Sequence, residues 1–164
     1  KYGMAVEEQS AGQRNKEPYN RFISMNFMIC RDAFLKVRFD ETFHLGYEDT
    51  LFGMQLEQAG VEILHIDNPV YHLVEENSEQ FLMKIRRAVR NLDGHIEQMH
   101  SHVKLLRWYA CVKRLGMAPL VAFLFRQIEK RLVSNLTSRK PSLKLFAFYK
   151  LGYLCNFLSQ KKPD

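Results

Sequence analysis

Short apolar runs separated by polar and breaker-rich stretches fill the first 76 residues of the chain. An apolar run of this length, bounded by turn residues, is typical of a buried β-strand. The runs are rich in Phe, Ile and Val, which favour strands, and the sequence Asp-Asn-Pro at 67–69 separates the last two. The pattern therefore predicts three strands, over residues 22–29, 61–66 and 70–74.

Helical spacing interrupts these runs in two places. Residues 32–37 predict a short helix, and residues 50–59 predict an amphipathic helix that carries its apolar side chains on one face. Gly60 follows directly and is expected to be the left-handed residue that ends the second helix. Residues 1–20 are polar and predict a loop with one helical turn.

From Asn77 onward the apolar positions recur with helical spacing and few breakers intervene. Gly94, Gly116 and Pro119 lie where one helix is expected to give way to the next. The predicted helices span residues 78–92, 94–115, 119–136 and 142–158. The expected fold class is therefore an α/β part over residues 1–76 followed by an all-α extension over residues 77–164.

Composition limits the class of protein. The chain has 164 residues, 46% of them hydrophobic and 26% charged, as in an ordinary soluble globular protein. No apolar run approaches the roughly 18 residues that a membrane span requires. The three cysteines have neither metal-ligand nor disulfide-motif spacing, which predicts free thiols in a reducing compartment and a cytoplasmic location.

The net charge of +6 conceals two oppositely charged parts. Residues 1–78 contain 7 basic and 13 acidic side chains, a net charge of −6. Residues 79–164 contain 17 basic and 5 acidic side chains, a net charge of +12. The acidic part suits a cationic ligand such as a metal ion, and the basic part suits an anionic surface.

Candidate chemistry gathers in residues 39–50, where acidic side chains alternate with aromatic ones. Glu48 and Asp49 are adjacent carboxylates at the expected start of a helix, whose free N–H groups favour an ionised carboxylate. A carboxylate held in a cleft can accept the proton of a substrate hydroxyl. The alternative is that Asp49 or Thr50 only caps the helix, because both residue types are preferred N-caps.

Three motifs taken together resemble the acceptor-side half of family 2 glycosyltransferases, which have the GT-A fold. They are Phe-Asp-Glu at 39–41, Gly-Tyr-Glu-Asp at 46–49 and Val-Tyr-His at 70–72. The resemblance covers about residues 20–92. It implies an enzyme that moves a sugar from a nucleotide-sugar donor to an acceptor hydroxyl with inversion, as in polysaccharide or glycolipid biosynthesis.

The resemblance also implies roles for individual residues. Asp49 would be the general base, and Glu48 and Tyr47 would bind the acceptor. His72 would help to coordinate a divalent cation, Mn²⁺ or Mg²⁺, at the donor diphosphate. The alternative for His72 is a strand histidine that bonds a backbone carbonyl. Asp40 and Glu41 are expected to brace the turn, and His65 is expected to be a core residue.

Two features of that family are missing from this sequence. The chain has neither an Asp-x-Asp metal motif nor a glycine-rich phosphate loop. Donor-binding groups and the main metal ligands are therefore expected in a preceding segment that this chain lacks. We expect the isolated chain to be inactive, with residues 1–76 forming only the acceptor side of the catalytic domain.

The basic helices after residue 76 have three interpretations. They are a solvated face packed on a catalytic core, a peripheral contact with an anionic inner leaflet, or, last in order, a nucleic-acid site without a recognised motif. A non-catalytic helical interaction or membrane-binding module is the alternative function for the whole chain. The candidate membrane or anion contacts are Arg126, Lys130, Arg131, Arg139, Lys140, Lys144 and Lys150.

Overall fold

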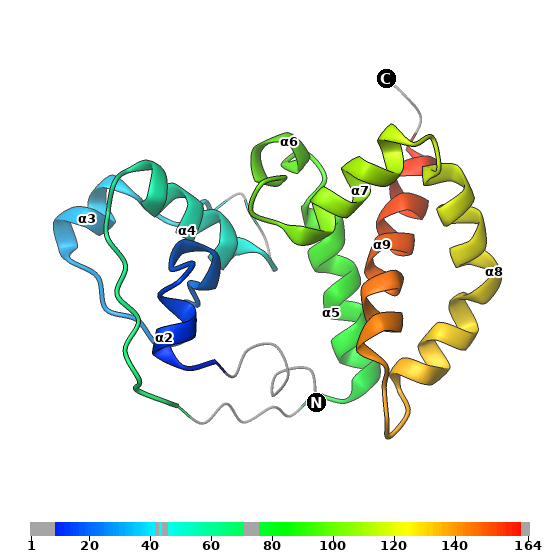
Figure 1. The fold of residues 1–164 in the computed structure, drawn as a ribbon, viewed down its shortest axis with the longest axis horizontal. Helices are drawn as coiled ribbons and strands as arrows, with labels where there is room; N and C mark the ends of the chain where they lie inside the picture. The colour runs from blue at the N-terminus through cyan, green and yellow to red at the C-terminus, as the bar shows by residue number, and fades with distance from the viewer. Residues whose placement is uncertain (1–8, 42, 44–45, 71–75, 162–164) are drawn as a thin grey trace. The chain divides into compact units, whose positions relative to one another are not determined.

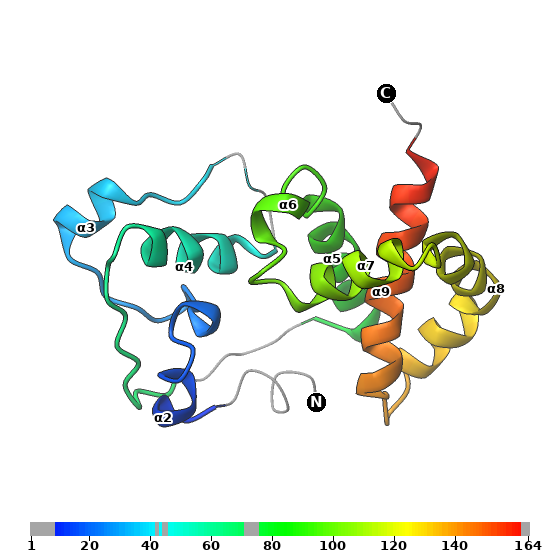
Figure 2. The ribbon, with the colours of Figure 1, turned by 45° about the horizontal axis from the view of Figure 1, so that its top comes forward.

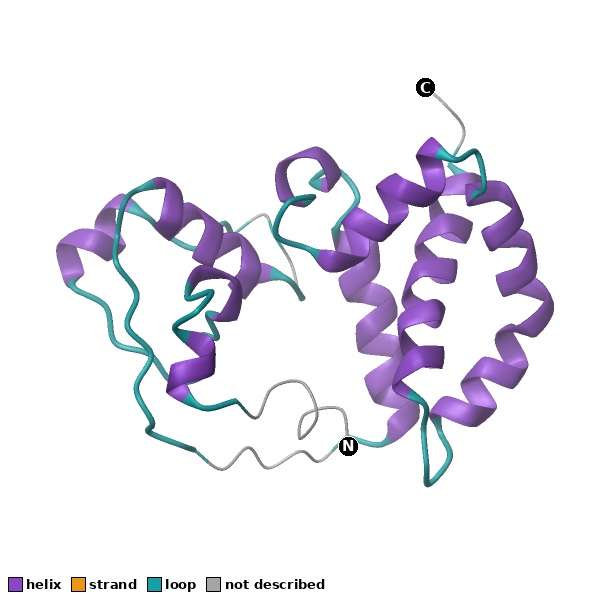
Figure 3. Ribbon diagram, viewed as in Figure 1, coloured by secondary structure: helices purple, strands orange, loops and turns teal. Residues whose placement is uncertain are grey.

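The computed structural model describes residues 9–41, 43, 46–70 and 76–161 (Figure 1). Within these ranges the chain forms eight α-helices and one 3-10 helix, and no residue lies in a β-strand (Figure 3). The chain divides into two compact units, Lys1–Glu75 and Glu76–Asp164, called unit 1 and unit 2 below. The assignment of catalytic and extension roles to two such parts stays a prediction.

The predicted α/β fold is wrong, since the expected strands are not formed in the described ranges. Residues 61–66 are extended, but a strand needs a neighbouring strand to pair its backbone groups. Here side chains from the N-terminal segment take that place. The N–H of His65 donates to Oδ1 of Asn15 at 2.8 Å, Nδ2 of Asn15 donates to the carbonyl of His65 at 2.8 Å, and Nη2 of Arg14 donates to the carbonyl of Ile66 at 2.8 Å. The chain is not an α/β fragment of the GT-A fold.

The apolar run over residues 22–29 was predicted as a strand and instead contains a turn. Phe22 is buried, but Met28 is 97% exposed, so the run is not enclosed on both sides as a central strand would be. Its aromatic rings pack on a helix, with the ring centroids of Phe22 and Phe52 5.3 Å apart. Of the third expected strand, 70–74, only Val70 is described, and it lies in a loop.

Unit 1 is held together by an aromatic core around one central helix. Its elements are α2 (Ala11–Arg14), the 3-10 helix η1 (Tyr19–Arg21), α3 (Arg31–Lys36) and α4 (Glu48–Gln58). Phe52 of α4 is 1% exposed and stacks on Phe39 with ring centroids 4.1 Å apart. Phe22 and Phe34 complete the cluster around the same ring. Phe39, the first residue of the Phe-Asp-Glu motif, is thus a core residue.

The α4 helix ends as the sequence predicted. Gly60 has a φ of 66°, its N–H donates to the carbonyl of Glu57, and the N–H of Val61 donates to the carbonyl of Leu56, each at 3.0 Å. This is the pair of bonds that defines a Schellman motif, which satisfies the last carbonyls of a helix. The prediction of Gly60 as the left-handed end residue is confirmed.

Unit 2 is a bundle in which the last helix is central. Its elements are α5 (Ser78–Asn91), α6 (Ile96–Met99), α7 (Lys104–Arg114), α8 (Ala118–Leu136) and α9 (Leu143–Gln160). The α9 helix lies between α5 and α8 and also contacts α7 (Figures 1 and 2). The helices predicted over 78–92, 119–136 and 142–158 are confirmed with small shifts at their ends.

The single helix predicted over residues 94–115 is broken into α6 and α7. The break allows Met99 and Val103, which are 0% and 4% exposed, both to enter the core. The N–H of Val103 still donates to the carbonyl of Met99 at 2.9 Å, so the backbone makes a turn between the two helices. A continuous helical pattern did not reveal this break, because the period of apolar residues continues across it.

Arginines of α5 stack on tyrosines of α9 at the same four-residue spacing. Nε of Arg86 donates to the hydroxyl of Tyr149, and Nε of Arg90 donates to that of Tyr153, each at 2.6 Å. Nη2 of Arg86 also donates to Oε1 of Glu129 on α8 at 2.8 Å. These charge-assisted bonds join three helices through groups that are only partly exposed.

Among the described helices, none by itself is both long and apolar enough to cross a membrane. The α7 and α8 helices pass that test only when taken together, and they are bent by 115° where they join.

Candidate functional site

The Gly-Tyr-Glu-Asp turn has an unusual backbone conformation. Gly46 has a φ of 95° and Tyr47 a φ of 72°, so two consecutive residues are left-handed. Within the described ranges Tyr47 is the only non-glycine residue with a positive φ. A bulky side chain in this region costs on the order of 1 kcal/mol or more, and such strain concentrates at functional sites.

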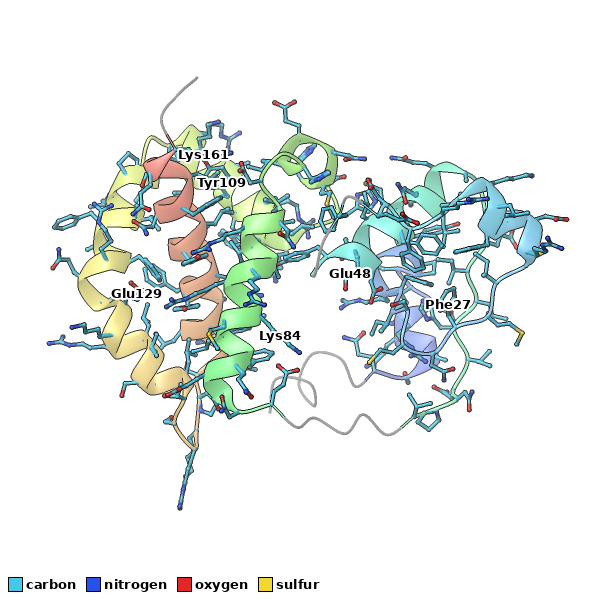
Figure 4. All side chains as sticks on the ribbon, turned by 180° about the vertical axis from the view of Figure 1, so that it is seen from behind. Phe27, Glu48, Lys84, Tyr109, Glu129 and Lys161 are labelled. Carbon is cyan, nitrogen blue, oxygen red and sulfur yellow. The ribbon has the colours of Figure 1, made fainter. Side chains whose placement is uncertain are left out.

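This backbone conformation places the carboxylates of Glu48 and Asp49 in the first helical turn of α4. The helix begins at Glu48 with Tyr47 at the cap position and no side-chain capping bond. Neither Asp49 nor Thr50 therefore occupies the cap, and the capping alternative is wrong. Oε2 of Glu48 instead accepts a hydrogen bond from the N–H of Gly46, which closes the turn on itself (Glu48 is labelled in Figure 4).

Asp49 differs from Glu48 in having an oxygen without a partner. Its Oδ1 is buried and accepts no hydrogen bond from any residue that the structure describes. A buried polar atom left without a hydrogen bond costs about 1–3 kcal/mol, and most such atoms in proteins are paired. Asp49 thus has an acceptor whose hydrogen-bonding capacity is unused in the described part of the chain.

A hollow of about 350 Å³ opens beside this turn. Its volume is at the lower end of the range of ligand pockets, about 300–1,000 Å³. Its lining combines polar and charged side chains of both signs with aromatic and aliphatic ones. The lining residues are Gln9, Arg14, Asn20, Arg21, Phe22, Ile23, Gly46, Tyr47, Glu48, Asp49 and Thr50.

The opposite wall of the hollow is positioned by a close approach of η1 to α4. A Cβ atom on Gly53 would lie 2.3 Å from the carbonyl oxygen of Tyr19, so only glycine permits this contact. The contact fixes η1, which carries Asn20 and Arg21, against the helix that carries Asp49. Because Gly53 has no side chain, η1 can lie close enough to α4 for residues of both elements to line the hollow.

Arg14 supplies a second unsatisfied polar atom. Its Nη2 donates to the carbonyl of Ile66, but its Nε is buried and donates to no acceptor in the described part of the chain. Two residues that line the hollow thus each carry a buried polar atom without a partner in the described part of the chain, an oxygen of Asp49 and an N–H of Arg14. A ligand with neighbouring hydroxyl groups, which both donate and accept, can satisfy groups of both kinds.

The structure brings together three of the residues expected at the site, namely Tyr47, Glu48 and Asp49. Asp40 lies in a tight turn in which its carbonyl accepts from the N–H of Phe43 at 3.0 Å. Nε2 of His65 lies 2.9 Å from the carbonyl oxygen of Pro18, outside the hollow.

Near this turn, the residues that the structure describes do not form a cation site. His72 lies outside the described residues. Across the ranges that the structure describes, no three His, Cys, Asp or Glu side chains are grouped so that they could hold a metal ion. Glu48 already accepts the N–H of Gly46, and among the described residues no third carboxylate or imidazole lines the hollow. The described residues do not fit a metal centre, and the divalent cation stays a prediction.

Sequence reasoning missed Arg14, Asn20 and Arg21. They belong to the polar N-terminal segment that was expected to be mostly loop, and no motif or spacing marks them. The packing of η1 on α4, with Tyr19 directly against Gly53, brings that segment to α4.

The expected anion contacts of unit 2 lie in two different settings. Arg126, Lys130 and Arg131 are exposed on α8, and Arg139, Lys140 and Lys144 are exposed between α8 and the first turn of α9. Lys150 is only partly exposed, and its Nζ lies 4.8 Å from the ring centroid of Phe146. Burial lowers the pKa of Lys150. The first six side chains are therefore placed to meet an anionic surface, and Lys150 is withdrawn from it.

Comparisons of the chain with protein-family models, with curated proteins and with solved structures found no match. The identification with family 2 glycosyltransferases rested on motifs that imply an α/β fold, and the described residues contain no strand. That identification is wrong. A function for this chain has to be argued from the groups in the hollow beside α4.

Proposed function

We propose that unit 1 binds the acceptor saccharide of a sugar-transfer reaction and that Asp49 is the general base. The observation that carries the proposal is the buried Oδ1 of Asp49, which has no hydrogen-bond partner in the described part of the chain and belongs to a residue that lines a ligand-sized hollow. The strained backbone of Tyr47 and the unpaired oxygen of Asp49 are only two positions apart in the sequence. Such costs are tolerated where function requires them.

The chemistry follows from the carboxylate. Asp49 accepts the proton of an acceptor hydroxyl as that oxygen attacks the anomeric carbon of the donor. The bond from the anomeric carbon to the nucleoside diphosphate breaks, and the diphosphate leaves with the electron pair. Attack from the face opposite the leaving group inverts the anomeric configuration.

The other groups bind and orient the acceptor. Glu48 keeps Oε1 available after Oε2 closes the turn on Gly46, and it accepts from a second hydroxyl. Arg14 and Arg21 donate to sugar oxygens from the facing wall. The ring of Tyr47 supplies an apolar surface for a sugar face. The donor and its cation need further groups, so we propose that residues 1–164 alone bind acceptor but do not turn it over.

Binding is tested by titrating the 164-residue chain with a panel of mono- and disaccharides while recording amide NMR spectra. We expect shifts to concentrate on Gly46, Tyr47 and Asp49. Asp49→Asn should weaken binding only a few-fold, because the amide oxygen still accepts one hydrogen bond. Glu62→Gln, a matched carboxylate-to-amide change at an exposed position of the same unit, should leave binding unchanged.

Turnover is tested in the longest natural form of the protein, with nucleotide sugars and Mn²⁺. The Asp49→Asn variant should lose at least about a hundredfold in kcat while retaining acceptor binding, because general-base catalysis contributes about 10²–10⁴-fold. The alternative, a non-catalytic binding module, predicts no transfer by either form. Full activity of Asp49→Asn would show that another group is the base.

A further inference from the structure

The α7 and α8 helices of unit 2 meet in a sharp, charge-free elbow. They are bent by 115° at their junction (Figure 1). Residues 115–125, which cover the junction and the first turns of α8, contain no charged side chain. Arg114 precedes this stretch directly and Arg126 follows it. An apolar segment with cationic residues at both ends is typical of a helix that enters a membrane interface.

Large apolar side chains at the elbow are exposed to solvent. Leu115 is 62% exposed, Trp108 56% and Leu120 50%. Single exposed apolar residues are normal in proteins, but six large ones within seventeen consecutive residues are more than this and favour an interaction site. We call the exposed set the elbow surface: it consists of Trp108, Leu115, Met117, Leu120, Phe123 and Leu124.

These side chains cannot turn inward, because the opposite face of α8 already fills the core. Ala122 and Phe125 are 1% and 0% exposed, whereas Phe123 and Leu124 between them face out. Gly116 has a φ of 68°, and the N–H of Met117 donates to the carbonyl of Val112 at 3.0 Å. This bond fixes the bend, so that the elbow surface stays exposed in the folded unit.

Basic side chains far outnumber acidic ones in the sequence from α7 to the end of α9. Residues 104–161 contain twelve Lys and Arg side chains and a single acidic residue, Glu129. Glu129 is paired with Arg86 of α5 at 2.8 Å, so it does not neutralise the exposed cations of α8. Arg126, Lys130 and Arg131 follow the apolar half of α8 on its exposed side. The surface thus combines an apolar wedge with an adjacent cationic strip.

We propose that the elbow surface inserts into the headgroup region of an anionic phospholipid bilayer, with Arg126, Lys130 and Arg131 contacting lipid phosphates. Charge complementarity selects the occupant. A nucleic acid would use the cations but would leave Trp108 and Leu115 in water, and a neutral protein partner would use the apolar residues but not the cations. An anionic bilayer is complementary to both.

Trp108 is the single tryptophan of the chain, which makes it a built-in reporter of the elbow. The 164-residue protein is mixed at low salt with phosphatidylcholine vesicles that do or do not contain phosphatidylserine. Insertion predicts a blue shift of tryptophan emission and co-flotation with the anionic vesicles, both reduced at high salt. Lipids with brominated acyl chains should quench the shifted emission.

Two variants separate insertion from charge attraction. Leu120→Gln with Phe123→Gln should lower vesicle partitioning at least about tenfold, because two inserted side chains are lost. Arg126→Gln, Lys130→Gln and Arg131→Gln together should lower partitioning about a hundredfold, since each cation near an anionic surface contributes about 1 kcal/mol. Circular dichroism checks that each variant keeps its helices.

The matched control makes the same kind of change in unit 1, where Met28 and Leu64 are 97% and 79% exposed. Met28→Gln with Leu64→Gln should leave partitioning unchanged. The proposal is overturned by unshifted Trp108 emission on anionic vesicles, or by equal losses in the control and elbow variants. It is also overturned if the elbow variant instead disrupts a dimer seen without lipid, or if the protein binds DNA or RNA but no vesicles. None of these outcomes depends on sugar binding by unit 1.

Discussion

Replacement of Gly53 by alanine tests whether the close approach of η1 to α4 builds the candidate site. In the structure a Cβ at position 53 would lie 2.3 Å from the carbonyl oxygen of Tyr19 and 3.3 Å from Cβ of Phe22. A Cβ atom essentially never lies within 3.0 Å of another non-bonded atom in proteins, so η1 must move by at least the difference of 0.7 Å. The obstacle is backbone, which cannot rotate away as a side chain could.

Two opposing effects determine how much Gly53→Ala changes the stability of α4. Alanine is about 1 kcal/mol better than glycine inside a helix. Overpacking costs about 1–3 kcal/mol, and a shift of 0.5–1 Å also forfeits a quarter to a half of each dispersion contact that it opens. The clash with backbone places Gly53→Ala at the upper end of this cost. We therefore expect a net loss of about 2 kcal/mol in the stability of α4.

The assay is native-state hydrogen exchange of the buried α4 amides, from Leu51 to Leu56, which reports the free energy of opening this helix. The matched control is Gly12→Ala, also a helical glycine of unit 1, where a Cβ meets nothing within 4 Å. The control should be neutral or up to about 1 kcal/mol stabilising. If Gly53→Ala stabilises α4 as the control does, the close approach is not real. Saccharide binding should also weaken in Gly53→Ala, since Asn20 and Arg21 move with η1.

Two further predictions concern unit 2. Burial raises the pKa of the Cys155 thiol to about 11, so its alkylation at pH 8 should be at least about a hundredfold slower than that of exposed Cys30, and equal rates would contradict the burial. Because the unfolded thiol ionises at a lower pH, the contribution of Cys155 to stability should fall as the pH rises from about 9 to 11. Tyr149→Phe should lower the free energy of unfolding, measured in urea, by about 1–2 kcal/mol, because Nε of Arg86 loses its acceptor at 2.6 Å. Glu129→Gln should cost less, since both members of that ion pair are about one-third exposed, and a larger loss than for Tyr149→Phe would contradict this order.

Local signals in the sequence were sufficient for most of the helices. Gly60 and Gly116 adopt the left-handed conformation that ends a helix, and Asn77 begins α5 with a reciprocal pair of bonds to Gln80. These features depend on residues within one or two turns of each other. The position of Glu48 and Asp49 in the first turn of a helix could be predicted for the same reason.

Extended segments were predicted wrongly because a strand is not a local property. Residues 61–66 have the composition of a strand. In the structure, however, backbone groups at the end of this segment form hydrogen bonds with the side chains of Arg14 and Asn15 and not with another strand. Short apolar runs do not specify a partner, and without one the backbone can be satisfied in other ways. The same limit applies to the motifs that resembled a known enzyme family. A motif specifies a few residue types, but it does not specify the strand pairing that would form the sheet of that fold.

The sequence by itself determined where most helices begin and end, that Glu48 and Asp49 lie together, and that the second half of the chain is strongly basic. Each of these depends on neighbouring residues or on composition. Only the tertiary structure decided that Arg14, Arg21 and Asp49 line the same hollow, that Lys150 is partly buried, and that the elbow between α7 and α8 exposes its apolar side chains. These features depend on which faces of distant segments pack together. The shapes of the packed side chains determine that packing, and even the lack of a Cβ at Gly53 contributes to it.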